Sequence, residues 1–208
     1  MMKGLFSRHT RVAGAIIGCL GFAVASGAPA RAALISTDTC DNAALSQPFA
    51  QWLDTSQYKL VPGGSFEGST AGWTLSHGAK VVSGSEPYGA TGAVGSHSID
   101  LPAGASVTSP FTCVDAAYPT FRFFGKNNGL LSTMAVSVVY KLPLLGQVAL
   151  PVGVDALSAA WGPSAPMLTA SVVTGLLSGG TTQVALRFTA LTGNSQVDDV
   201  FVDPKMHY

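Results

Sequence analysis

The chain has 208 residues, which is enough for one domain of ordinary size or at most two small ones. Charged residues make up 11% of it and hydrophobic residues 47%, a composition that excludes general disorder. Eleven basic residues balance eleven acidic ones, so the chain lacks the basic field that holds a nucleic-acid backbone.

The first 32 residues have the pattern of a signal peptide. The basic residues Lys3, Arg8 and Arg11 precede an uncharged apolar run over residues 12–28. Ala30-Arg31-Ala32 then has the A-x-A form of a cleavage site. Cleavage there removes four basic residues and no acid, so the chain from Ala33 onward is mildly acidic. The sequence therefore predicts a secreted protein, and after residue 32 it contains no apolar run long enough to span a membrane.

A second interpretation of the same segment is a lipid anchor. Ile16-Ile17-Gly18-Cys19 resembles a bacterial lipobox, in which the cysteine is lipidated and becomes the first residue. The apolar run continues past Cys19 as far as Val24, whereas a lipoprotein turns polar at that point. This favours secretion over lipidation of Cys19.

Two cysteines, Cys40 and Cys113, remain after cleavage. In an exported protein we expect so sparse a pair to form one disulfide, and two free buried thiols are the alternative. Closing this long loop would stabilise the fold by about 4 kcal/mol in the chain-entropy model.

Residues 33–56 are interpreted as an N-terminal extension that lies on the main body, held there through Cys40. The segment Asp41–Leu53 predicts a short helix that begins or breaks at Pro48. Its expected apolar face consists of Phe49, Trp52 and Leu53.

Residues 57–208 carry the pattern of a β-sandwich. Short runs alternate apolar and polar residues between turns rich in Gly, Pro, Ser and Asn, such as Thr192-Gly193-Asn194. Frequent short strands in one exported domain are typical of a sandwich or jelly roll. Residues 153–181 show no decisive periodicity. The expected strands are Tyr58–Val61, Gly72–Ser76, Ala79–Val82, His97–Leu101, Ser106–Ser109, Thr120–Gly125, Ser132–Lys141, Gln147–Pro151, Leu168–Val172, Thr182–Leu191 and Gln196–Val202.

The alternation within these strands separates a core face from an outer face. It places Arg122, Arg187 and Asp100 on outer positions. The residues expected to point inward are Trp73, Leu75, Ile99, Leu101, Phe121, Phe123, Met134, Val136, Val138, Tyr140, Val184, Leu186 and Phe188.

Motifs of known catalytic sites are missing. The chain contains no G-x-S-x-G elbow, H-E-x-x-H, G-x-G-x-x-G or P-loop pattern. A glycosidase needs two carboxylates facing one cleft, and Glu67 and Glu86 are the only glutamates. We therefore expect a protein that is not an enzyme, with an unrecognised hydrolase as the remaining catalytic alternative.

Two stretches resemble the ends of a known kind of domain. Residues 61–68 read Val-Pro-Gly-Gly-Ser-Phe-Glu-Gly and are followed by Gly72-Trp73-Thr74, and residues 196–202 read Gln-Val-Asp-Asp-Val-Phe-Val. Together they are similar to jelly-roll carbohydrate-binding modules and galactose-binding-like domains, which open with a G-x-F-E segment and close with an I/V-D-D-V strand. The resemblance spans roughly residues 60–203, is also seen in secreted bacterial proteins of the same plan, and implies an all-β jelly-roll-like sandwich.

Many such modules hold a structural calcium ion between the first and last strands, and the resemblance implies Glu67 and Asp198 as its side-chain ligands. The alternation favours Asp198 over Asp199, because Asp198 shares a face with Val200 and Val202 and is expected to point inward. The alternative is that Asp198 accepts hydrogen bonds from backbone amides or pairs with a basic residue.

Sugar-binding modules stack sugar rings on exposed aromatic side chains, but the predicted outer faces carry mostly Ser, Thr, Arg and Asp. Arg122 and Arg187 are candidates for a polar ligand face, and Tyr88 and Trp161 are candidates for binding anchors in loops. The alternatives are cross-strand ion pairs for the arginines and plugging of the sandwich end for the aromatics.

These patterns favour an exported, non-catalytic binding module for a polysaccharide or another cell-envelope component. A cell-surface domain that associates with other proteins and has no small ligand is the main alternative. The low charge and the abundant small residues fit a surface that packs against another protein.

Overall fold

The computed structural model describes residues 44–115, 120–129, 131–142, 144–169 and 181–203. All described residues belong to one compact unit. The predicted signal peptide, Cys19 and Cys40 lie outside the described residues. The Cys40–Cys113 disulfide therefore stays a prediction, although Cys113 itself is buried on a strand.

The first sheet has seven antiparallel strands in the order β10-β7-β13-β4-β3, with β1 beside β13 and β11 beside β7. Its first and last strands in sequence, β1 and β13, are neighbours. The strands of this sheet are β1 (Lys59–Leu60), β3 (Lys80–Ser83), β4 (His97–Leu101), β7 (Thr120–Asn127), β10 (Gly162–Pro163), β11 (Met167–Leu168) and β13 (Ser195–Asp203).

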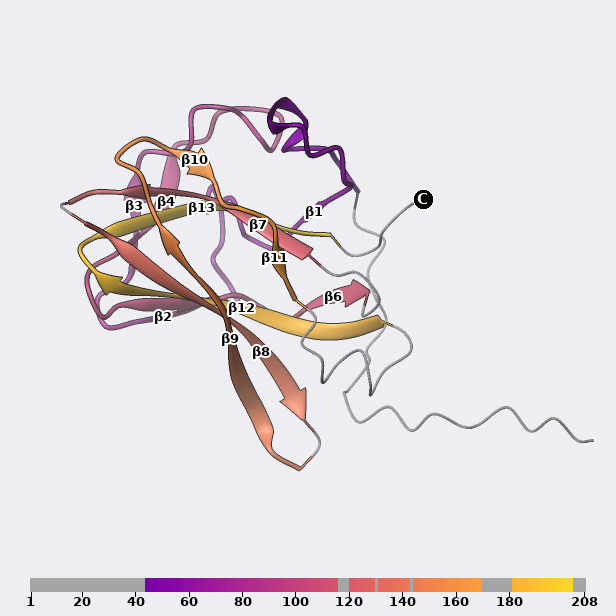
Figure 1. Ribbon diagram of the computed structural model, residues 1–208. Helices are drawn as coiled ribbons and strands as arrows, with labels where there is room; N and C mark the ends of the chain where they lie inside the picture. The colour runs from indigo at the N-terminus through magenta and orange to yellow at the C-terminus, as the bar shows by residue number, and fades with distance from the viewer. Residues whose placement is uncertain (1–43, 116–119, 130, 143, 170–180, 204–208) are drawn as a thin grey trace, which may run out of the picture. The chain divides into compact units, whose positions relative to one another are not determined.

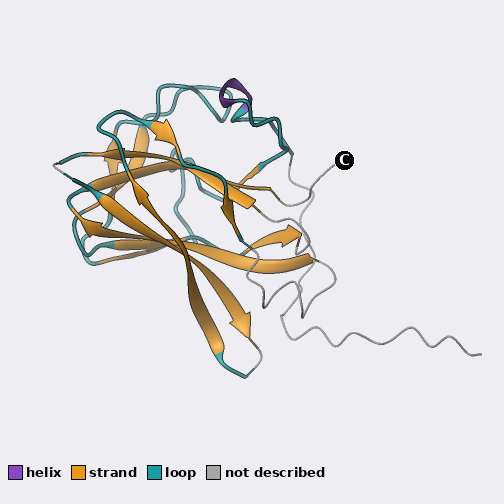
Figure 2. Ribbon diagram, in the orientation of Figure 1, coloured by secondary structure: helices purple, strands orange, loops and turns teal. Residues whose placement is uncertain are grey.

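The second sheet has six antiparallel strands in the order β2-β5-β12-β8-β9, with β6 beside β12. The two sheets lie one over the other as layers (Figures 1 and 2), which confirms the predicted all-β, jelly-roll-like sandwich. The strands of this sheet are β2 (Thr74–Ser76), β5 (Ser106–Thr108), β6 (Thr112–Asp115), β8 (Thr133–Leu142), β9 (Gly146–Ala156) and β12 (Thr181–Thr192).

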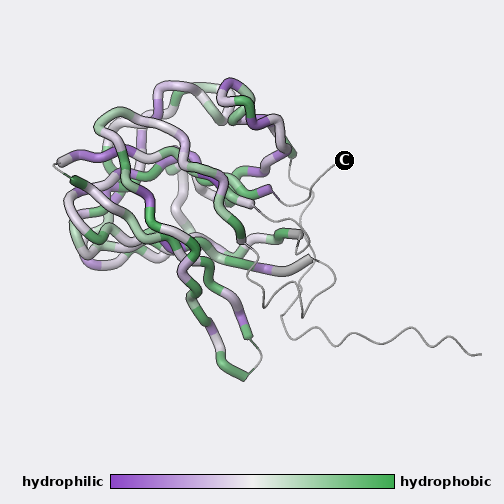
Figure 3. The backbone as a smooth tube through the Cα atoms, in the orientation of Figure 1, coloured by the Kyte–Doolittle hydropathy of each residue, from purple (hydrophilic) through white to green (hydrophobic). Residues whose placement is uncertain are grey.

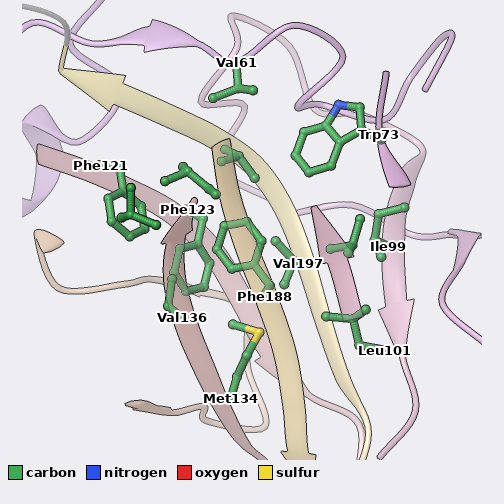
Figure 4. Packing of buried hydrophobic residues seen from close by; sticks show 14 of the residues in the cluster. Val61, Trp73, Ile99, Leu101, Phe121, Phe123, Met134, Val136, Phe188 and Val197 are labelled. Carbon is green, nitrogen blue, oxygen red and sulfur yellow. The ribbon is translucent and has the colours of Figure 1, made fainter. Parts of the chain in front are cut away.

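The core fills the space between the sheets, as the alternation in the sequence predicts. Phe121 and Phe123 from β7 face Phe188 from β12, and the rings of Phe123 and Phe188 meet edge to face with centroids 4.9 Å apart (Figure 4). The other residues expected to point inward, from Trp73 to Leu186, belong to this core or pack against it. Burial of this apolar surface is the main source of stability for such a fold.

A second apolar cluster lies on the opposite, outer face of the first sheet. It joins Phe49 of the N-terminal extension to Tyr58, Phe124 and Phe201. Phe49 stacks on Phe124 with ring centroids 5.4 Å apart. The extension therefore covers this face of the sandwich, as predicted.

Within the described part of the extension, the predicted helix is reduced to one 3-10 turn, η1 (Ala50–Trp52). Phe49 is buried and Trp52 is half-buried, but Leu53 is 94% exposed. Leu53 adopts a left-handed backbone with φ of 64°, which ends the turn and directs its side chain to solvent. The prediction that Leu53 belongs to the apolar face is wrong.

Two strands, β6 and β10, were not predicted from the sequence, and a third, β9, is longer than predicted. The strand β6 begins two residues after Pro110, β9 continues five residues beyond Pro151, and β10 has only two residues. The start of the predicted strand Leu168–Val172 appears in β11 (Met167–Leu168), and residues 170–180 lie outside the described part. The two residues of β10 are too few to show an alternating pattern.

A β-bulge in β13 changes the side on which Asp198 lies. The pairing of β13 with β7 shifts between Asp198 and Phe201, and Asp199 has a left-handed φ of 42°. As a result Val197, Val200 and Val202 all face the core, while Asp198 pairs with Phe124 and lies on the outer face. The prediction that Asp198 points inward with Val200 is therefore wrong, because it assumed strict alternation.

Candidate functional site

Arg122 is a buried structural residue under the N-terminal extension. Its guanidinium donates to Asp54 Oδ2 at 2.8 Å and to the Ser164 carbonyl at 2.8 Å, and its Cζ lies 4.3 Å from the centroid of the Phe49 ring. Only 6% of the residue is exposed. Arg122 is outside the main core as predicted, but the extension covers it.

Arg187 lies on the outer face of the other sheet. Its Nε donates to Thr108 Oγ1 at 3.0 Å across β12 and β5. Because Arg122 and Arg187 belong to different sheets, the prediction that they share one polar ligand face is wrong. Asp100, on β4, shares a sheet with Arg122 and not with Arg187.

The structure brings the two predicted loop aromatics together. The Tyr88 hydroxyl donates to the Trp161 carbonyl at 2.8 Å, although 73 residues separate them in the chain. The Tyr88 ring also meets the Trp52 ring edge to face, with centroids 4.9 Å apart. We call Trp52, Tyr88 and Trp161 the aromatic loop cluster.

This cluster rests on Phe124 and remains partly open to solvent. The Trp52 and Tyr88 rings lie 5.5 and 5.8 Å from the Phe124 ring, which is fully buried beneath them. Tyr88 is 43% exposed. The contacts fix the rings in place, so the exposed part of Tyr88 is a pre-organised apolar surface.

A cleft of about 510 Å³ opens beside Tyr88. One wall comes from the extension and the other from the loop that carries Tyr88. Polar side chains alternate with small residues along it. The lining residues are Ser46, Gln47, Pro48, Gln51, Tyr88, Gly89, Ala90, Thr91 and Gly92.

A row of polar side chains crosses the first sheet next to the aromatic loop cluster. The strand register aligns Lys80, Asp100, Gln196 and Lys126 on neighbouring strands. Lys126 Nζ lies 5.2 Å from the centroid of the Trp161 ring. Trp52 and Lys126 were not predicted as site residues, because only the fold brings them to the loops of Tyr88 and Trp161.

Four acidic residues gather around the loop of residues 84–96: Glu86 within it, and Glu67, Asp198 and Asp199 from other segments. Asp198 Oδ2 accepts hydrogen bonds from Ser85 Oγ at 2.6 Å and from the Glu86 N–H at 3.0 Å, and Asp198 Oδ1 accepts from the Asp199 N–H at 2.9 Å. Glu86 is fully buried and accepts from the backbone N–H groups of Tyr88 and Ala90. Glu86 thereby holds the loop that carries Tyr88.

Glu67 anchors the other end of this loop. Its Oε1 accepts from the backbone N–H groups of Ser96 and His97, both at 2.6 Å. Burial acts to raise the pKa of Glu67, but these two hydrogen bonds and the neighbouring His97 outweigh it and lower the pKa. Gly95 permits the approach, because a Cβ there would lie 2.5 Å from Glu67 Oε1.

The buried acids repel one another. Burial, followed by the charges of Asp198 and Glu86, raises the pKa of Asp199 to about 8. Burial also raises the pKa of Asp198 to about 6, and the hydrogen bonds it accepts offset only part of this rise. We call Glu67, Glu86, Asp198 and Asp199 the carboxylate cluster.

The donor set of the carboxylate cluster suits calcium in kind, because calcium prefers hard oxygen ligands. Among the described residues, however, no three Asp, Glu, His or Cys side chains are arranged to hold a metal ion. Glu67 and Asp198 already accept N–H and O–H donors, which matches the hydrogen-bonding alternative for Asp198. An ion held by these two side chains would need backbone carbonyls to complete its coordination.

A smaller cleft of about 190 Å³ is lined by Asp155 among small and apolar residues such as Gly125 and Leu157. The carboxylate cluster lines neither this cleft nor the cleft beside Tyr88. Burial raises the pKa of Asp155. The acids with the largest shifts, Asp198 and Asp199, are at most 3% exposed, so they have the wrong placement for work on an external substrate.

Known proteins resemble this chain in fold but not in sequence. No family model matches it, and no curated protein matches it. A solved structure with the same fold contains the CBM22-1 and GH10 modules of endo-1,4-β-D-xylanase 10B from Clostridium thermocellum, complexed with xylohexaose. It is 16% identical, has a TM-score of 0.50, and the match covers 70% of this chain and 28% of that one.

Two further matches are carbohydrate-binding modules. The CBM22-1 xylan-binding domain of Paenibacillus barcinonensis Xyn10C is 13% identical, with a TM-score of 0.46 and coverage of 69% of this chain and 94% of that one. The family 11 module of Clostridium thermocellum, in complex with a β-1,3-1,4-mixed-linked tetrasaccharide, is 12% identical, with a TM-score of 0.42 and coverage of 73% and 98%. At the level of fold, the resemblance to jelly-roll carbohydrate-binding modules is confirmed.

Proposed function

We propose that this protein is an exported, non-catalytic module that binds a polysaccharide through the aromatic loop cluster. The observation that carries the proposal is the placement of Tyr88. Its ring is half exposed at the wall of the 510 Å³ cleft, and it is fixed by Trp52 and by its hydrogen bond to the Trp161 carbonyl. A rigid, exposed aromatic ring beside polar groups is the surface that sugar rings stack on.

The surroundings of Tyr88 supply hydrogen-bonding groups for sugar hydroxyls. Gln47 and Gln51 line the cleft on one side of the ring and Thr91 lines it on the other. Lys126 lies over Trp161 on the far side of the cluster. The outer face of the second sheet, by contrast, offers Arg187 and Thr108 but lacks an exposed aromatic ring within its described strands.

Affinity electrophoresis tests this assignment. The chain from Ala33 onward is run against xylan, galactan, mixed-linked β-glucan and solubilised cell-wall fractions. We expect retardation by at least one glycan and a loss of about 10-fold or more in affinity for Tyr88→Ala. Tyr88→Phe should lose less, because it keeps the ring and removes only the hydrogen bond to the Trp161 carbonyl.

Val94→Ser is the matched control, because Val94 is exposed in the same loop but does not line the cleft. Equal losses for Tyr88→Ala and Val94→Ser would contradict the assignment. Absence of retardation by every glycan would overturn the proposal and favour the protein-associating alternative.

Export is proposed from the N-terminal sequence pattern alone. Expression of the full chain in a bacterial host, followed by mass spectrometry of the exported product, tests it. A product starting at Ala33 supports secretion, and a lipid-modified product starting at Cys19 supports the anchored form instead. Among the described residues, no helix is long and apolar enough to cross a membrane.

A structural calcium ion is a separate proposal, and its support is the concentration of buried negative charge around Asp198 and Asp199. A bound cation would favour the ionised carboxylates of Glu67 and Asp198 and join the start of the sandwich to its last strand. We expect calcium to raise the melting temperature and EDTA to lower it, with Asp198→Asn abolishing the difference. Melting temperatures that are equal in calcium and EDTA would show that hydrogen bonds alone hold this cluster.

A further inference from the structure

The β8–β9 hairpin extends beyond the rest of the second sheet. Its pairing runs from Thr133 opposite Ala156 to Leu142 opposite Gly146, whereas β12 accompanies β8 only as far as Tyr140. In Figure 1 the two strands project away from the other strands of the sandwich. The described residues from Lys141 to Gly146, which we call the hairpin tip, therefore have no partner in β12, although Leu142 still packs against the core.

This tip is apolar and open to solvent. Leu144 is 97% exposed and Leu145 is 72% exposed, and Figure 3 shows hydrophobic colouring at the end of the hairpin. Lys141 is the only charged residue between Lys126 and Asp155 in the sequence. Two adjacent exposed leucines at the end of a projecting element are in unfavourable contact with water, which indicates a site of interaction with another apolar surface.

We propose that the hairpin tip inserts Leu144 and Leu145 into a lipid surface, with Lys141 at the level of the lipid headgroups. Leu144 and Leu145 lie in the turn between the end of β8 at Leu142 and the start of β9 at Gly146. Apolar faces of peripheral proteins enter the headgroup and acyl boundary by about 5–10 Å, so two leucines in such a turn suit shallow insertion.

The charge distribution of the hairpin fits the same partner. Lys141 is exposed, and its ammonium lies 4.3 Å from the centroid of the Phe111 ring. A lysine at the base of an uncharged tip is placed to attract anionic headgroups. The first acid along the hairpin, Asp155, lies at its far end, opposite Met134, where it does not enter the headgroup region.

A second copy of the chain fits the tip less well. A stable protein interface needs about 800 Å² from each partner, and two leucine side chains at a point supply much less. The long edge of β9 is also interrupted for strand pairing, because Pro151 lacks an N–H and lies beside a register shift of the hairpin. Binding to lipid requires neither a large complementary interface nor a free strand edge, because acyl chains rearrange around a small apolar group.

Vesicle co-sedimentation tests the inference. The chain from Ala33 onward is used, because the apolar residues 12–28 would bind lipid themselves. We expect binding to vesicles of phosphatidylcholine with an equal amount of phosphatidylglycerol, and a loss of at least about 10-fold for the double variant Leu144→Ser, Leu145→Ser. Lys141→Gln is expected to lose about fivefold on these anionic vesicles and nothing on phosphatidylcholine alone.

The matched control is the double variant Leu53→Ser, Leu131→Ser. It removes two leucines that are 94% and 84% exposed elsewhere on the molecule, so it should bind vesicles as well as the unchanged chain does. The inference is overturned if the unchanged chain binds neither vesicle, or if the control loses as much as the tip variant. It is also overturned if the tip variant only converts a dimer into a monomer in sedimentation equilibrium, since the tip would then contact a second copy.

Discussion

Arg122 donates a hydrogen bond from Nη1 to Asp54 Oδ2 at 2.8 Å, and this ion pair joins β7 to the N-terminal extension. Tyr58 donates to the same Oδ2 at 2.8 Å. Burial acts to raise the pKa of Asp54, but the hydrogen bonds from Tyr58, Arg122 and Ser56 outweigh it and lower the pKa. Because the extension also forms one wall of the cleft beside Tyr88, this ion pair links the stability of the fold to the geometry of the candidate site.

We predict that Asp54→Ala destabilises the fold by about 3 kcal/mol, because it leaves the buried Arg122 guanidinium without its ionic partner. Urea denaturation measures the change in the free energy of unfolding. Glycan affinity should fall as well, since the wall formed by Gln47 and Gln51 loses its attachment. Leu53→Ala is the control, because Leu53 is adjacent and almost fully exposed. A control that destabilises equally would contradict the role assigned to the ion pair.

Because of the carboxylate cluster, we predict that the free energy of unfolding falls as the pH rises. The folded chain holds protons on Asp199 up to about pH 8 and on Asp198 up to about pH 6, whereas both groups have an ordinary pKa of 3.8. Their contribution is fully present below pH 3.8 and is lost as the pH rises through 6 and then 8. In EDTA we expect the free energy of unfolding to fall by on the order of 5 kcal/mol between pH 5 and pH 8.5.

Asp199→Asn should flatten this pH dependence. Asparagine keeps a donor for Glu86 and tolerates the left-handed backbone at this position, but it carries no charge. Asp100→Asn, on the same sheet but outside the carboxylate cluster, should leave the dependence intact. Denaturation curves at the two pH values give the comparison, and a variant Asp199→Asn with an unchanged slope would show that Asp199 does not govern it.

The disulfide between Cys40 and Cys113 remains open to a direct test. Non-reducing peptide mapping by mass spectrometry of the exported protein should show the two cysteines linked. Reduction should then lower the free energy of unfolding by about 4 kcal/mol in the chain-entropy model. If both thiols are alkylated without reduction, the alternative of two free thiols is correct.

Much of the fold was predictable because alternation determines which side chains point inward. The runs around Phe121, Met134 and Val184 each have a strict two-residue period, and all three belong to the core in the structure. The expected face of Asp198 was wrong because a bulge at Asp199 breaks that period, and a sequence gives little warning of a bulge without glycine.

The candidate site was only partly predictable, because its members come from separate segments. Tyr88 and Trp161 stood out as aromatic residues in loops, but their contact depends on how β10 and the loop of Glu86 lie over Phe124. Arg122 had the spacing of an outer residue and lies on the outer side. Its burial under Phe49 comes from the extension, whose packing no local pattern in β7 reveals.

A further variant distinguishes the aromatic loop cluster from the outer face of the second sheet as the glycan-binding surface. Arg187→Ala removes a half-buried basic group of the second sheet and its hydrogen bond to Thr108, without touching the aromatic loop cluster. We expect glycan affinity to change by less than about twofold, because a cross-strand contact on a solvated sheet has little effect on a distant site. Isothermal titration with whichever glycan retards the protein measures this. Arg122 is unsuitable for such a test, because its loss would loosen the extension and the cleft together. A loss of affinity in Arg187→Ala that equals the loss in Tyr88→Ala would move the binding surface to the second sheet.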